Sequence, residues 1–362
     1  MPLILFALGA VEERERGQNT EYRIQNSEPN SEPRTPNPEL RTSNSEQCTV
    51  NAERKLDFFR RPMSECVVPD PRISVVTPSY NQGQFIEQTI LSVLEQKYPE
   101  LEYQILDGGS QDGTFTILQK YDAKLSFWRS GKDSGQAAAI NEGFQRSSGD
   151  ILCWLNSDDL YLAHTLDTVA KILAGNVDEP LILYGGCELF DDRTGACELR
   201  PAITFDPALI AVSDFLDQPS TFWTRKAWEM VGPLDESLHY GFDWEWFIRA
   251  SKVCHFVSLG QTLSRYRIHA LHKSRSGGKP RWLELLKIVR MHSSPDVIRN
   301  YEYLLANDLA RWWLNKRMRM EGMIHAVAPG VAAVAANVLS PPFWFVPPDI
   351  SREMLWKISG IR

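Results

Sequence analysis

Hydrophobic and polar positions alternate along residues 73–155 in a pattern typical of strands and helices that follow one another. Short apolar runs, several of them β-branched, predict four strands, at Ile73–Thr77, Leu101–Leu106, Leu125–Trp128 and Ile151–Leu155. Between these runs, apolar residues recur at helical spacing, which predicts helices over residues 86–94, 115–121 and 134–144. This alternation predicts a parallel sheet whose strands are joined by right-handed helical crossovers.

Polar or glycine-rich residues stand at the ends of the predicted strands. Tyr80 follows the first strand, Asp107-Gly108-Gly109-Ser110 ends the second, and Asn156-Ser157-Asp158-Asp159 ends the fourth. Because the carboxyl ends of parallel strands meet at one edge of a sheet, we expect these residues in one crevice. Adjacent carboxylates are suitable ligands for a divalent cation that carries a phosphate. The same Asn-Ser-Asp-Asp run is also good turn and capping chemistry, so both interpretations stay open.

Composition excludes several classes of protein. The 362 residues are 43% hydrophobic, enough for one large domain or two smaller ones. A net charge of -7 and a pI near 5.6 argue against a nucleic-acid partner. The sequence contains neither a phosphate-binding loop of the ATPase type nor a dinucleotide fingerprint. Its six cysteines have no Cys-x-x-Cys spacing, which favours reduced thiols in the cytoplasm.

Four motifs occur in an order that identifies a known family. They read ISVVTPSYNQ at 73–82, LDGGSQDGT at 106–114, SGQAAAINEG at 134–143 and WLNSDD at 154–159. Over roughly residues 73–274 the chain resembles family 2 glycosyltransferases of the GT-A fold. The resemblance implies an α/β protein with a mixed, mainly parallel sheet flanked by helices. It also implies Mg²⁺ or Mn²⁺ as cofactor, a nucleotide-diphospho-sugar donor (a UDP-, GDP- or dTDP-sugar), and inversion at the anomeric carbon. The donor-binding residues that it implies are Pro78, Tyr80, Asp107, Asn156 and Asp158.

Two departures from the family pattern change what we expect of the site. Asn156 occupies the first position of the family's Asp-x-Asp motif. An asparagine can bond a ribose hydroxyl but has no charge, so Asp158 and Asp159 are expected to hold the metal. Gly108 stands where many relatives have another aspartate, which leaves the selectivity for the nucleobase open.

A Tyr-Arg-x-His segment at 266–269 resembles the one that closes the catalytic domain in relatives. By this resemblance His269 is a third candidate metal ligand, and Lys273 with Arg267 is expected to neutralise the leaving group. The alternative is that His269 is an ordinary hydrogen-bonded histidine of the structure.

The catalytic base is predicted in the second half of the chain. Asp243 matches the position of the general base in relatives, which must take the proton of the acceptor hydroxyl. Glu245 is the competing candidate, although residues two apart on one helix point to different faces. We expect Trp223, Trp244 and Glu245 to line the acceptor site, and the alternative for the indoles is packing in the core.

The sequence also predicts how the chain is divided. Residues 1–70 lack an apolar period and are expected to be disordered. Residues 71–276 form the predicted glycosyltransferase domain, with a nucleotide-sugar half at 71–160 and an acceptor half at 161–276. Residues 277–362 are predicted to be a helical extension. Its apolar segment 326–346 follows several basic residues, and peripheral membrane binding or packing on the catalytic domain would both explain it.

Three functions are compatible with these patterns. The first is a metal-dependent inverting glycosyltransferase of cell-envelope or exopolysaccharide synthesis, cytoplasmic or at the inner face of the membrane. Its acceptor would be a saccharide or a lipid-linked saccharide. A nucleotidyltransferase should show a basic, glycine-rich loop near the first strand, and this loop is absent from the sequence. A non-catalytic carbohydrate- or nucleotide-binding module would have eroded acidic positions, as Asn156 hints, whereas Asp107, Asp158, Asp159 and Asp243 are intact.

Overall fold

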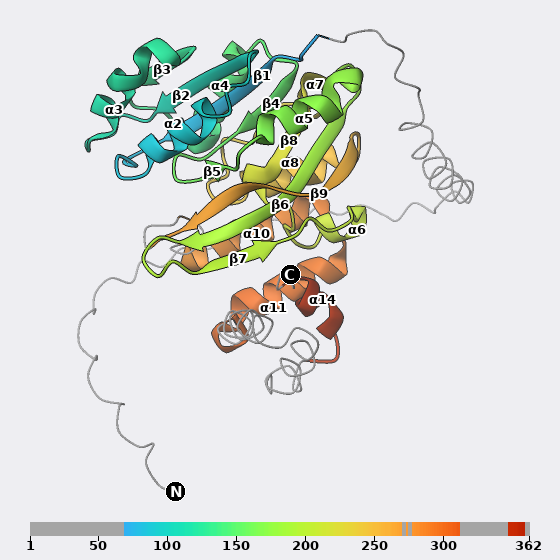
Figure 1. Ribbon diagram of the computed structural model, residues 1–362. Coiled ribbons are helices and arrows are strands. Elements are labelled where there is room, and N and C mark those ends of the chain that lie inside the picture. Colours follow the sequence, from blue (N-terminus) through green and yellow to red (C-terminus); the bar gives the residue numbers. More distant parts are fainter. Residues whose placement is uncertain (1–68, 270–272, 274–276, 312–346, 359–362) are drawn as a thin grey trace, which may run out of the picture. The chain divides into compact units, whose positions relative to one another are not determined.

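The computed structural model describes residues 69–269, 273, 277–311 and 347–358 (Figure 1). Most of the segment predicted to be disordered, residues 1–68, lies outside the described residues. The apolar segment 326–346 also lies outside them. Both predictions therefore stay as the sequence makes them.

The described elements alternate in the first half of the chain and become more strand-rich in the second. In chain order they are β1 (Ile73–Ser79), α2 (Ile86–Leu94), β2 (Leu101–Asp107), α3 (Thr114–Tyr121), η1 (Asp122–Lys124), β3 (Phe127–Ser130), α4 (Gln136–Arg146), β4 (Ile151–Trp154), β5 (Leu160–Tyr161), α5 (Thr165–Leu173), η2 (Ala174–Asn176), β6 (Leu181–Asp191), β7 (Cys197–Arg200), α6 (Pro207–Ile210), η3 (Gln218–Ser220), β8 (Thr221–Thr224), α7 (Arg225–Val231), α8 (Phe242–Ala250), β9 (His255–Ile268), α10 (Gly278–His292), α11 (Pro295–Ala306) and α14 (Arg352–Ile358).

The strands form one nine-stranded sheet in the order β3-β2-β1-β4-β8-β6-β9-β5, with β7 paired to β6 (Figure 1). β3, β2, β1 and β4 run parallel, which confirms the alternating pattern predicted for the first half. β8 runs antiparallel to both β4 and β6, and β6 pairs in parallel with the long strand β9. The fold is therefore a mixed α/β sheet flanked by helices, as predicted.

The third predicted strand is placed two residues too early. The prediction covers Leu125–Trp128, whereas β3 spans Phe127–Ser130. The amide of Leu125 donates to the carbonyl oxygen of Asp122 and closes the short helical turn η1, so this residue does not pair with β2. The difference matters because the true strand ends at Ser130, next to Gly131 and Lys132.

Side chains alternate between two hydrophobic cores on the two faces of the sheet. Along β1, Ile73 and Val75 pack into one core, while Val76 packs into the other. Residues of α2, α3 and α5 fill the first core, and residues of α4, α8, α10 and α11 fill the second. Strands buried on both faces read as nearly continuous apolar runs, which explains why the sequence predicted them well.

The C-terminal helices share the core of the second face. Leu285 and Ile288 of α10 and Tyr301 of α11 are buried in the same cluster as Trp244 of α8. The division of the chain at residue 277 stays a prediction. None of the helices in the described part of the chain combines the length and the apolar character needed to cross a bilayer.

Gly143 of α4 provides a test of this packing. A Cβ at this position would lie 2.5 Å from Cγ1 of Val76 and 3.2 Å from Cδ2 of Leu106. Gly143→Ala should therefore lower the free energy of unfolding by about 1–3 kcal/mol, because a packed interior does not absorb an added methyl group without strain. Urea denaturation measures this change.

Gly175→Ala is the matched control, because nothing lies within 4 Å of a Cβ built there. Its free energy of unfolding should stay within about 0.5 kcal/mol of the parent value. Equal stability of the two variants would mean that α4 does not press on β1 as described.

Candidate active site

The carboxyl ends of the parallel strands lie side by side at one edge of the sheet. Ser79 at the end of β1 is aligned with Asp107 of β2, which in turn is aligned with Ser130 of β3. The loops beyond β1 and β2 are joined, because the amide of Asn81 donates to Oγ of Ser110 over 2.7 Å. The predicted convergence of the ends of β1 and β2 at this edge is therefore present.

Tyr80 and Pro78, both predicted to bind the donor, have opposite surroundings. Tyr80 is 62% exposed, whereas Pro78 is buried in β1. Between them, the hydroxyl of Ser79 is buried and has no hydrogen-bond partner in the described part of the chain. A buried hydroxyl without a partner is uncommon, which makes Ser79 a candidate for contact with a bound ligand. The sequence analysis assigned no role to Ser79 and missed this.

Asp107 lies beneath the loop that follows β2 and is fully buried. Its carboxylate accepts hydrogen bonds from the amides of Gly109 (3.2 Å) and Ser110 (3.0 Å), and from the hydroxyls of Ser110 (2.5 Å) and Ser130 (2.6 Å). These four donors occupy both oxygens. In this conformation Asp107 shapes the loop, and its predicted contact with the donor stays a prediction.

The glycine pair after Asp107 permits a close approach between two loops. Gly109 has a φ of +84°, and a Cβ there would lie 3.2 Å from the amide nitrogen of Lys132. A Cβ on Gly108 would lie 3.3 Å from both the Tyr80 ring and the Asp133 carboxylate oxygens. Asp133 thus borders the position where many relatives have an aspartate.

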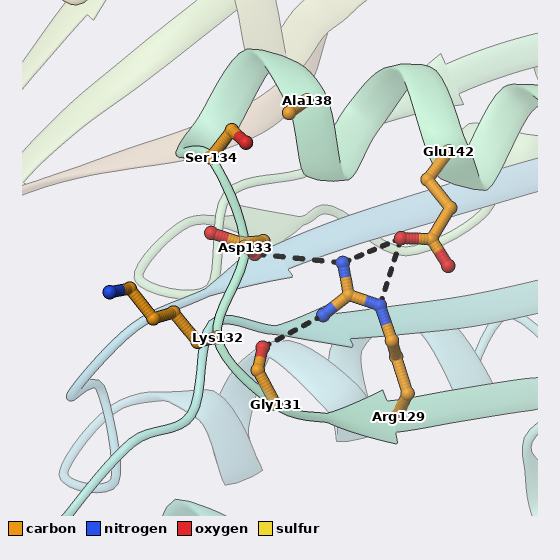
Figure 2. A pocket seen from close by; sticks show the side chains of 7 residues that line it. All are labelled: Arg129, Gly131, Lys132, Asp133, Ser134, Ala138 and Glu142. Carbon is orange, nitrogen blue, oxygen red and sulfur yellow. Dashed lines mark hydrogen bonds and ion pairs between the residues drawn. The ribbon is translucent and has the colours of Figure 1, made fainter.

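A cavity of about 310 Å³ opens beside this loop, at the end of β3. Its lining residues are Arg129, Gly131, Lys132, Asp133, Ser134, Ala138 and Glu142. Figure 2 shows the Arg129 side chain directed at Glu142, whose carboxylate it contacts at 2.6 Å, and at Asp133, 3.6 Å away. Sequence reasoning missed this cavity because the third strand was predicted to end before Arg129.

The residues after β4 form the predicted turn and also present carboxylates. The amide of Asp159 donates to the carbonyl of Asn156, which closes the turn. The Asp158 carboxylate lies 2.9 Å from Nε2 of His269, and both side chains are nearly buried. The turn interpretation of this sequence is therefore correct, and the turn brings Asp158 to His269. The metal interpretation stays a prediction.

Asp159 points in a different direction from Asp158. It is 1% exposed, and its two oxygens accept from the amide of Arg267 (3.0 Å) and from Nδ2 of Asn156 (3.2 Å). Burial, with the nearby charge of Asp158, raises the pKa of Asp159 well above the usual aspartate value.

The Arg267 side chain lies against the turn that follows β4. It is 1% exposed, its Nε donates to the carbonyl of Asp158 over 2.8 Å, and its other nitrogens bond Gln88 and Asp192. The guanidinium also lies over the rings of Phe85 (4.8 Å) and Phe190 (4.6 Å). Arg267 is thus committed to protein groups, and its predicted role beside the leaving group stays a prediction.

A chain of polar contacts connects this turn to the second half of the site. Oδ1 of Asn156 accepts from Nε2 of Gln136 over 2.9 Å, and Oε1 of Gln136 accepts from Nζ of Lys273 over 2.9 Å. Lys273 lies over the ring of Phe242 at 5.4 Å, beside the candidate base Asp243. Burial lowers the pKa of Lys273, and Asp243 opposes this effect. Lys273 therefore lies between the turn after β4 and Asp243.

The two candidate bases both belong to α8 but have different partners. Asp243 is half-buried, and burial raises its pKa despite the amide of Trp244, which donates to it over 2.8 Å, and the charges of Lys273 and Arg281. Glu245 is 4% exposed and paired with Arg249 (2.9 Å) and His292 (3.1 Å). Of the two carboxylates, that of Asp243 is the one whose surroundings include Lys273.

The residues predicted to bind the acceptor are enclosed by the protein. Trp223 is 0% exposed within an aromatic cluster, and its Nε1 has no partner among the described residues. Trp244 is 1% exposed and donates to the carbonyl of Ile210 over 2.7 Å. The acceptor assignments of Trp223, Trp244 and Glu245 stay predictions, and contact with an acceptor would require their neighbours to move.

The fit of a divalent cation can be judged from the donor set. Within the described residues, no three His, Cys, Asp or Glu side chains converge to form a complete cage. Asp158 and His269 offer one oxygen and one nitrogen at one point, while Asp159 is held by Arg267 and Asn156. Mg²⁺ is commonly held by one or two carboxylates and completes its shell with phosphates and water, so the Asp158 carboxylate fits such an ion, whereas Nε2 of His269 already contacts that carboxylate. The metal itself stays a prediction.

Comparison with solved structures defines the class of fold. Residues 1–349 of S. aureus TarS, in complex with UDP-GlcNAc, match with a TM-score of 0.51 at 17% identity, over 72% of this chain and 82% of that one. The same protein without that ligand matches with a TM-score of 0.50. At this identity the likeness is one of fold, and the fold is that of the GT-A glycosyltransferases.

Sequence comparison gives the same class. The model of glycosyl transferase family 2 matches residues 74–183 of the chain. An uncharacterised glycosyltransferase of Rickettsia typhi is 26% identical over 211 residues, which are 55% of this chain and 64% of the relative. TuaG of Bacillus subtilis, named for teichuronic acid biosynthesis, is 40% identical over 100 residues, 27% of this chain and 40% of its own length. The chain thus spans about 64% of the length of the Rickettsia relative.

The buried guanidinium of Arg267 makes the site sensitive to a conservative change. Arg267→Lys keeps the charge but loses the planar fork that serves Asp158, Gln88 and Asp192 together. We expect the free energy of unfolding to fall by about 3 kcal/mol or more, because a buried positive charge would lose hydrogen bonds that replace its hydration. Chemical denaturation monitored by tryptophan fluorescence measures the loss.

The control is Arg265→Lys on the same strand. Arg265 is one-third exposed and pairs with Glu188 at 2.7 Å, so its change should cost less than about 1 kcal/mol. Similar losses in the two variants would contradict the central position of Arg267.

Proposed function

We propose that this protein is a metal-dependent, inverting glycosyltransferase that moves a sugar from a nucleotide-diphospho-sugar to a hydroxyl acceptor. The observation that carries the proposal is the polar chain from Asn156, through Gln136, to Lys273 beside Asp243. Asn156 belongs to the same turn that presents Asp158 to His269. It links a place for a metal and diphosphate to a carboxylate that can take a proton. TarS binds UDP-GlcNAc and TuaG is named for a cell-wall polymer, which supports a nucleotide-sugar donor and a role in envelope polysaccharide synthesis.

The donor half of the proposed site holds the diphosphate. Asp158 and His269 would hold Mg²⁺ or Mn²⁺, which when bound offsets the charge that develops on the leaving nucleotide. Tyr80 offers an exposed ring and Ser79 a buried hydroxyl at the end of β1. Lys273 lies on the opposite side of Asn156 and adds a positive charge next to the same leaving group.

The acceptor half supplies the base. In an inverting transfer the acceptor oxygen attacks the anomeric carbon while the bond from that carbon to the diphosphate breaks. The proton of the acceptor hydroxyl passes to the base, for which we propose the Asp243 carboxylate. Burial raises the pKa of Asp243, which makes it a better proton acceptor than an ordinary surface aspartate. Glu245 is engaged by Arg249 and His292 and has less freedom for this task.

A non-catalytic binding module is the second candidate. Asn156 replaces the first acid of the family motif, and both Asp107 and Asp159 direct their carboxylates to protein donors. Such a module would still bind a nucleotide but would transfer no sugar. Location at the inner face of the cytoplasmic membrane and a saccharide or lipid-linked acceptor stay predictions from the sequence.

Donor binding is the first test. Thermal stabilisation of the protein by UDP-, GDP-, dTDP- and CDP-sugars, with and without Mn²⁺, should reveal one nucleotide whose effect depends on the metal. Asp158→Asn should remove most of the metal-dependent part of that shift, because one of two protein ligands loses its charge. Asp178→Asn, at an exposed position, is the control and should keep the full shift. A shift that is identical with and without Mn²⁺ would contradict metal dependence.

Asp243→Asn tests the proposed base. It should lower kcat for sugar transfer by about 10²–10⁴-fold while donor affinity stays within about twofold, because only the proton acceptor is lost. Glu245→Gln and the exposed Glu229→Gln are the comparison variants. Loss of transfer in Glu245→Gln with full activity in Asp243→Asn would reverse the assignment.

The pH profile gives a second reading of the base. Since Asp243 must be deprotonated and its pKa is raised, kcat should fall on acidification at a pH above that of an ordinary aspartate. A fall that begins only at the usual aspartate pKa would mean that Asp243 does not limit the reaction.

A further inference from the structure

A carboxylate of α10 is bonded to the loop that leads into the base-bearing helix. The oxygens of Glu284 accept hydrogen bonds from three consecutive amides, those of His239 (2.7 Å), Tyr240 (2.5 Å) and Gly241 (2.8 Å). These residues directly precede Phe242, the first residue of α8, and Asp243 follows it. Glu284 is separated from them by more than forty positions in the sequence.

This contact anchors the loop that leads into α8. The N-cap residue of α8 is Gly241, which has no side chain and therefore makes no side-chain cap. The amides bound by Glu284 are those of the N-cap residue and the two residues before it, so Glu284 holds the entry to the helix rather than the amides of its first turn. Its negative charge lies at the positive end of the helix dipole, which is a favourable arrangement. Its bonds to three amides fix the position and the direction of the start of α8.

The packing around this contact is tight. A Cβ on Gly241 would lie 2.8 Å from Cδ1 of Ile288 and 3.3 Å from Cδ2 of Leu285, so the loop backbone lies directly on α10. A second contact joins the same two segments, between Nζ of Lys287 and Oγ of Ser237 at 3.0 Å. The loop at 237–241 therefore has little freedom to move independently of α10.

The charges of Arg281 and Glu284 also act on two residues of the proposed site. Arg281, one turn before Glu284 on α10, lowers the pKa of Asp243 and so opposes the effect of burial. The Glu284 charge also acts on Lys273, together with that of Asp243. The charges on this face of α10 thus influence the protonation of the proposed base and of the lysine beside it.

We propose that Glu284 is a positioning residue for the transfer reaction, which holds the start of α8 so that the Asp243 carboxylate meets the acceptor hydroxyl. This inference rests on the proposed function of Asp243. It places a residue beyond the region of family resemblance among those that the reaction needs. In the part of the chain that the structure describes, the hydrogen bonds of Glu284 go to backbone amides of the loop before α8, so its removal should mainly affect the geometry of the base. Its charge also acts on Lys273, and Glu284→Gln, which removes the charge but keeps an acceptor oxygen, separates this effect from loss of the loop contact.

The test compares Glu284→Ala and Glu284→Gln with Glu302→Ala. Glu302 lies on α11, and its exposed side chain pairs with Arg290, so it is a matched control. In the full chain, Glu284→Ala should lower kcat for sugar transfer about 10–100-fold, with KM for the donor within twofold. Glu284→Gln keeps an acceptor oxygen and should recover part of the loss. Glu302→Ala should behave as the parent protein.

Hydrogen exchange separates positioning from a purely structural role. The amides of residues 239–241 should exchange faster in Glu284→Ala, while those of β1 and β2 keep their protection. Unchanged exchange at 239–241 would show that Glu284 does not hold this loop. Faster exchange with an unchanged kcat per folded molecule overturns the positioning role. Absence of transfer by the parent protein with every donor would instead refute the proposed function, and the exchange result would still decide whether Glu284 holds the loop.

Discussion

The buried guanidinium of Arg267 is the interaction on which the rest of the site depends. A charge removed from water is tolerated only where protein groups replace the solvent, and Asp192, Gln88, the carbonyl of Asp158 and two aromatic rings do so here. Arg267 belongs to β9. It lies 109 positions after Asp158, whose carbonyl oxygen it binds. The turn after β4 therefore takes its final form only when β9 has paired with β6 and β5.

The first half of the fold could be predicted because its signals are local. β1, β2 and β4 are buried on both faces and interrupted by polar strand ends, so their positions follow from short stretches of sequence. Convergence of their ends follows from parallel pairing alone. β3 was shifted because the amide of Leu125 bonds Asp122, a competition between a short turn and a strand that the apolar pattern does not reveal.

The surroundings of the carboxylates could not be predicted in the same way. The sequence motifs identified four carboxylates as candidate site residues: Asp107, Asp158, Asp159 and Asp243. Each of them contacts a different set of partners. The Asp107 oxygens are occupied by its own loop, those of Asp159 by Arg267 and Asn156, and Asp158 meets His269. These partners come from residues up to about a hundred positions away, and their choice depends on how the whole sheet closes.

The composition of α8 has a consequence for how such a protein can change during evolution. Along Phe242–Ala250, Asp243 is half-buried, and the four residues after Trp244 are buried on every side. Inserting or deleting one residue would rotate the rest of the helix by about 100°, which would turn an indole toward the crevice or a carboxylate toward the core. The proposed catalytic position and the core thus depend on the same helix and on its length. New acceptors are accommodated by remodelling the connecting loops, where added residues disturb neither.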